Sequence, residues 1–282
     1  MRIAVVTGAS RGAGKGIALA LGETGATVYV TGRTRREGDA PLPGTVFATA
    51  EEISRRGGTG VPVVCDHADD AQVAALFDRV RASHGRLDVL VNNACAIPDR
   101  LAAKGPFWTK PLGLQAMFDV GLRSSYAASH HAAPLLTRDP DAGGLIAFTS
   151  SFGGGCYMHG PAYGAVKAGV DKMAHDMAVD LRPFGVAVVS IWMGLLRTER
   201  TERALAAAPE RYGALSTESP EFTGRVIAAL ARHPDRMSWS GQTVVGAELG
   251  KALGVTDVDG RAPASHRPLL GGPTTYNDAI VD

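Results

Sequence analysis

The stretch YGAVK places Tyr163 and Lys167 four positions apart, within residues 161–181, which are predicted to form one long helix. Positions four apart share one face of a helix. A free phenol has a pKa of about 10, too high for easy proton exchange at neutral pH. An ammonium about 4 Å away, at an effective dielectric of about 20, would favour the phenolate by on the order of 4 kcal/mol, or roughly 3 pKa units. Tyr163 would then serve as an acid in a reduction and as a base in an oxidation.

The same spacing also occurs on ordinary amphipathic helices, so the rest of the chain must decide between reaction and packing. A second chemical feature is the stretch TGASRGAG at 7–14, whose glycines are Gly8, Gly12 and Gly14. Glycine lets a backbone turn sharply and approach a phosphate group closely. A helix that begins directly after such a turn offers free N–H groups and a partial positive charge to an anion. Although glycine also serves plain turns, its place between the first strand and the first helix predicts a nucleotide site.

The residues after the second predicted strand indicate which dinucleotide would bind there. Sites selective for NAD often carry an acidic residue at this point, but here the chain reads TGRTRR, with no carboxylate before Glu37. Arg33 in this stretch and Arg11 in the glycine loop are suited to a 2′-phosphate. We therefore expect NADP(H) to be preferred and NAD(H) to be possible, the alternative being that both arginines are solvated surface residues. Asp66 is placed either to bond the adenine or to cap the next helix.

These groups must be positioned by a regular framework, which the hydrophobic pattern predicts. Short apolar runs alternate with helical patterns such as 70–85, in which Val73, Leu76, Phe77 and Val80 form one stripe. The pattern predicts an α/β fold with a single doubly wound domain of about seven parallel strands and helices on both faces. The predicted strands are 2–7, 27–31, 61–65, 86–93, 144–150, 185–192 and 243–249.

Composition excludes several classes of function. The 282 residues carry a net charge of +1 with no long basic run, so we expect neither nucleic acid nor a membrane as a partner. The three cysteines show no CxxC spacing and fit a reducing compartment, and no signal or spanning segment is recognisable. We therefore expect a cytoplasmic protein. The histidines lack ligand spacing, so no metal is expected.

Several motifs together resemble the short-chain dehydrogenase/reductase family. They are TGASRGAG, NNA at 92–94, SS at 150–151, YGAVK, and MGLLRT at 193–198, in the family's order and at about its spacing. The resemblance covers roughly residues 3–255 and implies a Rossmann-type, NADP(H)-linked carbonyl reductase or alcohol dehydrogenase. It implies a homodimer or homotetramer acting on a small molecule. We expect residues 1–255 to form the catalytic domain, with 194–220 covering the substrate and 256–282 forming an extension on the surface or at a subunit contact.

The resemblance also assigns roles to residues. Lys167 would hold the nicotinamide ribose, and a serine would bond the substrate oxygen; family spacing selects Ser150, whereas the motif TSSFGG selects Ser151, which we choose. The expected catalytic residues are Ser151, Tyr163 and Lys167. The expected cofactor-binding residues are Gly8, Ser10, Arg11, Gly12, Gly14, Arg33, Thr34, Asp66, Asn93, Ala94, Tyr163, Lys167, Gly194, Leu196 and Thr198.

The substrate side is expected in the long segments 95–111 and 194–220, which follow strands. Trp108, Phe152, Tyr157 and Met193 are its expected lining residues. Their apolar character predicts a hydrophobic carbonyl or secondary alcohol as the substrate. The alternative for Trp108 is that it pins its own loop to the body of the protein.

Three positions depart from the family pattern. Gly121 stands where many members have an asparagine, Cys95 where glycine is usual, and Met193 where proline is usual. The alternative to an active enzyme is a catalytically silent NADP(H)-binding sensor or scaffold. Such a protein would be expected to lose the tyrosine or the lysine, and this chain keeps both.

Overall fold

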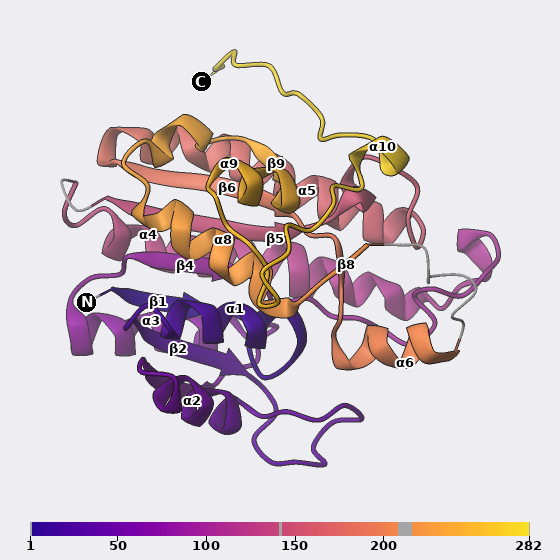
Figure 1. The fold of residues 1–282 in the computed structure, drawn as a ribbon, viewed down its shortest axis with the longest axis horizontal. Helices are drawn as coiled ribbons and strands as arrows, with labels where there is room; N and C mark the ends of the chain where they lie inside the picture. Colours follow the sequence, from indigo (N-terminus) through magenta and orange to yellow (C-terminus); the bar gives the residue numbers. More distant parts are fainter. Residues whose placement is uncertain (1, 141–142, 208–215, 282) are drawn as a thin grey trace.

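The computed structural model describes residues 2–140, 143–207 and 216–281 and is built on one central sheet. Seven parallel strands lie in the order β3-β2-β1-β4-β5-β6-β9, which confirms the predicted doubly wound fold (Figure 1). The strands are β1 (Ile3–Val6), β2 (Thr27–Gly32), β3 (Thr59–Val64), β4 (Val89–Asn92), β5 (Gly144–Ser150), β6 (Val186–Trp192) and β9 (Thr243–Val245).

Helices pack on both faces of this sheet, because the inner strands are mostly apolar and are buried along their whole length on both sides. The first face carries α1 (Gly12–Gly22), α2 (Val46–Arg55), α8 (Pro220–Arg232) and α9 (Gly246–Ala252). The second face carries α3 (Asp70–His84), α4 (Ser124–Leu136) and α5 (Pro161–Leu181). Helix α5 has the bounds that the sequence predicts.

Helices α1 and α8 approach closely on the first face (Figure 1). A Cβ at Gly16 would lie 2.3 Å from the backbone carbon of Pro220, and one at Gly224 would lie 2.6 Å from Cα of Ile17. Contacts this short exclude any side chain, so glycine at both positions is what allows the two helices to touch. The contact fixes α1, and with it the glycine loop at its start.

The strand order reverses between β1 and β4, and this reversal places the candidate site. From β1 the chain moves through β2 to β3, and it then returns to build β4, β5, β6 and β9 on the other side of β1. Loops that leave the carboxyl ends of β1 and β4 therefore separate and leave a crevice between them, where ligands bind in folds of this kind.

The last predicted strand is wrong in its second half. Residues 243–249 were expected to be a strand, but β9 ends at Val245 and α9 begins at Gly246. The β-branched residues of this stretch stop at Val245, and Ala247, Glu248 and Leu249 favour a helix. Strand β3 begins and ends earlier than the predicted strand 61–65, and β4 is shorter than the predicted strand 86–93. The ends of strands depend on hydrogen bonds to neighbouring strands, which the local sequence pattern does not reveal.

The two long excursions have more structure than expected. Residues 95–111 include a 3₁₀ turn at Phe107–Thr109, which a second turn (Leu112–Gln115) and a π-helical turn (Phe118–Arg123) follow. In 194–220, β7 (Leu195–Leu196) pairs in parallel with β8 (Thr217–Glu218), and α6 (Glu199–Ala207) lies between them, while 208–215 fall outside the described residues. Further 3₁₀ turns are Phe152–Gly154, Arg182–Phe184 and Arg236–Trp239.

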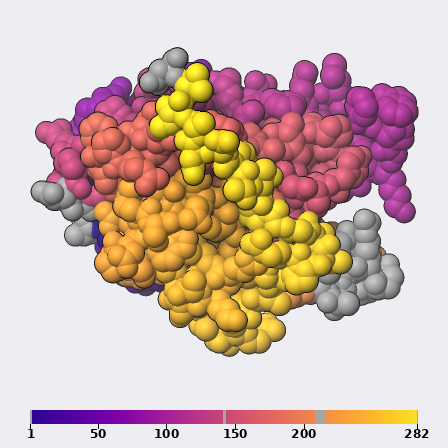
Figure 2. Space-filling model, turned by 90° about the horizontal axis from the view of Figure 1, so that it is seen from above, coloured from indigo at the N-terminus to yellow at the C-terminus, as the bar shows by residue number. Residues whose placement is uncertain are grey.

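The end of the chain runs over the outside of the molecule (Figure 2). It contains the short helix α10 (Arg267–Leu270) and is otherwise without regular structure. Within the described ranges, no helix is both long enough and apolar enough to span a bilayer.

Candidate active site

Helix α5 and the strand beside it bring Ser151, Tyr163 and Lys167 together. The hydroxyl oxygens of Ser151 and Tyr163 are 2.9 Å apart. The Nζ atom of Lys167 lies 5.7 Å from the centre of the Tyr163 ring, and it donates a hydrogen bond of 3.1 Å to the carbonyl of Thr149. Pro161 in the first turn of α5 follows Gly160, whose φ of +108° lets the chain turn into the helix. Tyr163 thus stands near the beginning of α5, at the carboxyl end of β5.

The two neighbouring serines have different surroundings. Ser151 follows β5 in an extended conformation and accepts a hydrogen bond from the N–H of Gly153, so its hydroxyl is fixed toward Tyr163. Ser150 is fully buried and donates to the carbonyl of Lys167 over 3.3 Å. Gly153 is needed here, because a Cβ at this position would lie 2.6 Å from the Tyr163 ring. Ser151 is therefore the serine with its hydroxyl at the tyrosine.

Lys167 is only 7% exposed, and burial works against its charge. Attraction to Tyr163, followed by Cys95 and Asp171, outweighs that effect and holds the pKa of Lys167 above its ordinary value. Asp171 is one helical turn further along α5 and accepts from the Ser190 hydroxyl at 2.6 Å and from the Trp192 indole at 2.8 Å. Burial raises the pKa of Asp171 despite these donors. Sequence reasoning missed this carboxylate, although its spacing of four from Lys167 was visible.

The glycine loop packs tightly against the end of β4. A Cβ at Gly8, whose φ is +65°, would lie 2.8 Å from Cα of Ala94, and one at Gly14 would lie 2.3 Å from the carbonyl oxygen of Gly8. The side-chain amide of Asn93 donates to that same carbonyl over 3.1 Å. Thr7, which sequence reasoning also missed, accepts from the N–H groups of Asn93 and Ala94 at 2.8 and 2.9 Å. Gly8, Gly14, Asn93 and Ala94 therefore form one continuous wall.

Arg11 and Thr34 come together beside this loop. The Arg11 guanidinium donates to the Thr34 hydroxyl at 2.9 Å and to the carbonyls of Pro43 and Gly44 at 2.9 and 2.7 Å. Burial is the main reason that the pKa of Arg11 lies below its usual value. Ser10 is buried beneath the loop, and its hydroxyl oxygen is 3.6 Å from where a Cβ of Gly32 would be.

Arg33 points into solvent, with a side chain that is 74% exposed and a nitrogen 3.8 Å from a carboxylate oxygen of Asp66. Asp66 also accepts from the N–H of Ala68 at 3.0 Å, so it stabilises its own turn. The neighbouring His67 is buried and lies 2.7 Å from the Thr31 hydroxyl. Burial lowers the pKa of His67 to about 4, so this ring is neutral at physiological pH.

The stretch 193–198, which follows β6, lies across from the glycine loop. The N–H of Met193 donates to the carbonyl of Ser150 at 3.2 Å, and that of Gly194 donates to the Glu218 carboxylate at 3.0 Å. Leu196 pairs with Glu218 in the β7–β8 ladder, and the side chain of Thr198 lies next to Gly12. Glu218 is 2% exposed. Burial raises the pKa of Glu218 to about 7, and Asp257 adds to this, although the Gly194 hydrogen bond opposes it.

The expected substrate residues differ widely in exposure. Trp108 and Tyr157 are 73% and 78% exposed, and Trp108 stacks edge-on with Phe107. Phe152 is instead 2% exposed and packs on Trp192, because the turn that follows Ser151 directs its ring into the core. Met193 is half-buried beside Ser150.

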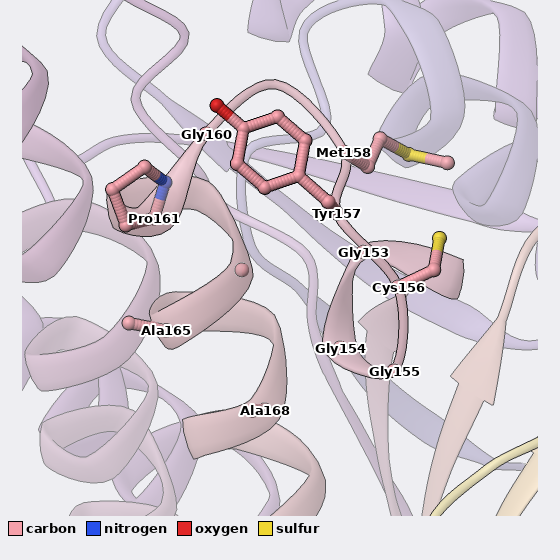
Figure 3. A pocket seen from close by; sticks show the side chains of 11 residues that line it. Gly153, Gly154, Gly155, Cys156, Tyr157, Met158, Gly160, Pro161, Ala165 and Ala168 are labelled. Atoms are coloured by element: carbon pink, nitrogen blue, oxygen red, sulfur yellow. The ribbon is translucent and has the colours of Figure 1, made fainter. Parts of the chain in front are cut away.

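A cavity of about 320 Å³ lies between the loop 153–160 and α5, with Tyr157 and Met158 at its rim (Figure 3). Its helical lining residues are Pro161, Gly164, Ala165 and Ala168. Successive residues of a helix are turned by about 100°, so this face is distinct from the one that carries Tyr163 and Lys167. The cavity is therefore next to the reacting groups but does not contain them.

Gly121 and Cys95 are neighbours at the inner end of the crevice. Gly121 has a φ of +147° at a kink before α4, and a Cβ there would lie 3.2 Å from Val166 and 3.3 Å from the Cys95 sulfur. The Ser125 hydroxyl donates to the Gly121 carbonyl over 2.7 Å. Within the described part of the chain, no group of three His, Cys, Asp or Glu side chains is placed to hold a metal ion.

Comparison with known proteins gives a consistent result. Residues 2–208 match the sequence profile of a family described as short chain dehydrogenase. The chain is 40% identical over 273 residues to mouse Dehydrogenase/reductase SDR family member 1, covering 92% of this chain and 84% of the mouse protein. The human protein of the same name is 39% identical over the same shares.

Solved structures share the fold. A short-chain type dehydrogenase/reductase from Mycobacterium marinum superposes with a TM-score of 0.72 at 28% identity, covering 86% of this chain and 93% of the other. A 7 alpha-hydroxysteroid dehydrogenase, solved with NADH and 7-oxo glycochenodeoxycholic acid, superposes with a TM-score of 0.71 at 24% identity, covering 86% and 92%. At that identity the second likeness concerns the fold alone.

Proposed function

This chain belongs to the short-chain dehydrogenase family, and on that premise we propose that it is an NADP(H)-dependent oxidoreductase that uses Tyr163 as its general acid and base. The proposed reaction interconverts a hydrophobic carbonyl compound and a secondary alcohol. The observation that carries the proposal is the contact of 2.9 Å between the Ser151 and Tyr163 hydroxyls, next to the buried Lys167 cation.

The residues around the crevice fit a nicotinamide dinucleotide. A side chain at Gly8 or Gly14 would collide with neighbouring backbone atoms. Because these positions carry no side chains, the backbone of the loop can approach a pyrophosphate closely. Arg11, held beside Thr34 by Nε and one terminal nitrogen, would offer its other terminal nitrogen to a 2′-phosphate, and the exposed Arg33 would supply a second guanidinium. When bound, the nicotinamide supplies or accepts a hydride.

The remaining steps belong to side chains of this protein. In the reduction, the Tyr163 hydroxyl donates its proton to the substrate oxygen, and Ser151 holds that oxygen by a hydrogen bond. Negative charge that develops on the tyrosine oxygen is stabilised by the Lys167 ammonium, which the Thr149 carbonyl holds in place. In the oxidation the proton moves in the opposite direction.

Activity with NADPH and NADH on a panel of aromatic and alicyclic ketones tests the proposal. We expect faster turnover with NADPH, and we expect Tyr163→Phe to lower kcat by at least about 10²-fold, because the proton donor is lost. Tyr126→Phe is the matched control, since Tyr126 is an exposed tyrosine of α4. Cofactor binding without turnover on any ketone would instead favour a catalytically silent sensor or scaffold.

We further propose a cytoplasmic homodimer or homotetramer. The three cysteines Cys65, Cys95 and Cys156 are free, which suits a reducing compartment. Light scattering on the purified protein measures the subunit number, and a monomer at micromolar concentration would contradict this part of the proposal.

A further inference from the structure

The amino terminus of α1 is capped by a carboxylate from a distant part of the chain. The N–H of Gly12, the first residue of α1, donates to both carboxylate oxygens of Glu199, at 3.0 and 3.3 Å. Arg11, at the capping position itself, makes no side-chain capping bond within the part of the chain that the structure describes. The first turn of α1 contains no acidic residue. Glu199 is thus the anion at this helix end, where free N–H groups and the helix dipole favour negative charge.

Glu199 also links this helix end to the segment beside the crevice. It is the first residue of α6 and directly follows Thr198, whose methyl group would be 3.7 Å from a Cβ of Gly12. All residues of α6 are described, and none of them is buried. Because α6 contributes little to the core, the contact between Glu199 and Gly12 helps to fix the position of the first turn of α6.

We propose that Glu199 competes with the pyrophosphate of the cofactor for the amino terminus of α1, and that it thereby sets cofactor affinity. The inference rests on the proposed function, because it assumes that a dinucleotide binds at the glycine loop. An anion bound at a helix amino terminus uses the free N–H groups of the first turn, and Gly12 already gives its N–H to Glu199. Two anions at one helix end also repel each other.

Two consequences follow from this competition. Cofactor binding costs the free energy of releasing Glu199 from Gly12, so the measured affinity is lower than the loop alone would give. The Glu199 carboxylate, at the first residue of α6, must release the Gly12 N–H when the dinucleotide binds. The conformation of this side chain is therefore coupled to occupancy of the cofactor site.

The dissociation constant of NADPH, measured by fluorescence, tests the competition without using activity. We expect Glu199→Gln to bind NADPH about tenfold more tightly than the wild type, equivalent to about 1.4 kcal/mol. Glu202→Gln is the matched control, because it removes the same charge from an exposed position of the same helix and should leave the constant unchanged. Thermal unfolding of both variants checks that they fold.

Binding of 2′-AMP separates competition from general electrostatics, since this nucleotide carries the adenosine 2′-phosphate but no pyrophosphate. Because Glu199 also attracts the Arg11 guanidinium, we expect 2′-AMP binding to tighten in Glu199→Gln by much less than NADPH binding does. Equal tightening for NADPH and 2′-AMP, or equal NADPH affinity in the wild type and the variant, would overturn the inference alone. Failure of every form of the protein to bind NADPH or NADH would overturn the proposed function together with it.

Discussion

The polar side chains of the candidate site come from helix α5 and from the end of strand β5. Ser151, Tyr163, Lys167 and Asp171 are all reached within one strand end and three helical turns. Single substitutions at these positions can therefore test the role of each side chain separately.

The two adjacent serines allow a sharp test. We expect Ser151→Ala to lower kcat/KM by about 10²-fold, because the hydrogen bond to the substrate oxygen is lost. Ser151→Thr should recover part of the loss, since it keeps a hydroxyl. Ser150→Ala should change kcat/KM by much less and should cost about 1 kcal/mol of stability, because its hydroxyl bonds the Lys167 carbonyl inside the protein. The opposite ranking of the two serines in steady-state kinetics would assign the role to Ser150.

Glu218 predicts a pH dependence of stability. Burial raises its folded-state pKa to about 7, above the ordinary value of 4.5, so the folded protein keeps a proton that the unfolded chain releases. Its contribution is therefore fully present below about pH 4.5 and is lost as the pH rises toward about 7, by on the order of 3 kcal/mol. We expect urea unfolding to show this loss in the wild type but not in Glu218→Gln. Parallel stability curves for the two proteins between pH 4.5 and 7.5 would contradict it.

The sequence could predict those site residues that belong to short sequence motifs. Tyr163, Lys167 and the glycines lie in short motifs, and the structure places Lys167 at the Tyr163 ring and Gly8 against Ala94. Thr7, Asp171 and Glu218 were not predicted, because their importance comes from partners 19 to 87 positions away. Phe152 was expected to line the substrate site, and nothing in its neighbouring residues reveals that its ring turns onto Trp192.

At the scale of elements, the kink before α4 decides how the inner end of the crevice is shaped. Gly121 has a left-handed backbone there, between Val166 and Cys95. Apolar periodicity predicted the sheet and α5, since buried strands and a long helix have strong signals. It could not predict this kink or the β7–β8 ladder, since each involves only two or three residues and has no periodic signal. The start of α9 was missed although local propensity favours a helix after Val245.

The kink can be tested by restoring the residue that is common in the family. We expect Gly121→Asn to lower the free energy of unfolding by about 1–3 kcal/mol, because a side chain is strained at this φ and meets two neighbours. Gly113→Asn is the control, since a Cβ there would meet no described atom within 4 Å. Chemical denaturation of both variants gives the comparison, and a stable Gly121→Asn protein would show that the kink adapts.

At the scale of the whole molecule, residues 265–270 near the end of the chain are attached next to the turn that follows Ser151. Arg267 and Ser265 both bond the Glu248 carboxylate of α9, at 2.6 to 2.8 Å. The His266 ring lies 6.1 Å from the ring of Phe152, which directly follows Ser151, and Leu270 packs on the same cluster. The end of the chain therefore supports the catalytic region from outside.

Truncation tests this support. We expect a chain that ends at Pro263 to be less stable by on the order of 2 kcal/mol, because Phe152 and Trp192 lose apolar cover. A chain that ends at Asn277 should keep the wild-type stability within about 0.5 kcal/mol, since residues 278–281 are exposed. Calorimetry measures the melting temperatures of both shortened chains. Equal melting temperatures would show that residues 264–277 do not stabilise the protein.

The surroundings of Trp192 have an optical consequence. Its indole is almost fully buried and bonds at 2.8 Å to Asp171, which is one helical turn from Lys167 on α5, whereas Trp108 is 73% exposed. Emission from Trp192 should be shifted to the blue and shielded from dissolved iodide, which reaches Trp108. The protein thus carries a natural spectroscopic probe beside its reacting groups, and changes of charge there can be followed without any added dye.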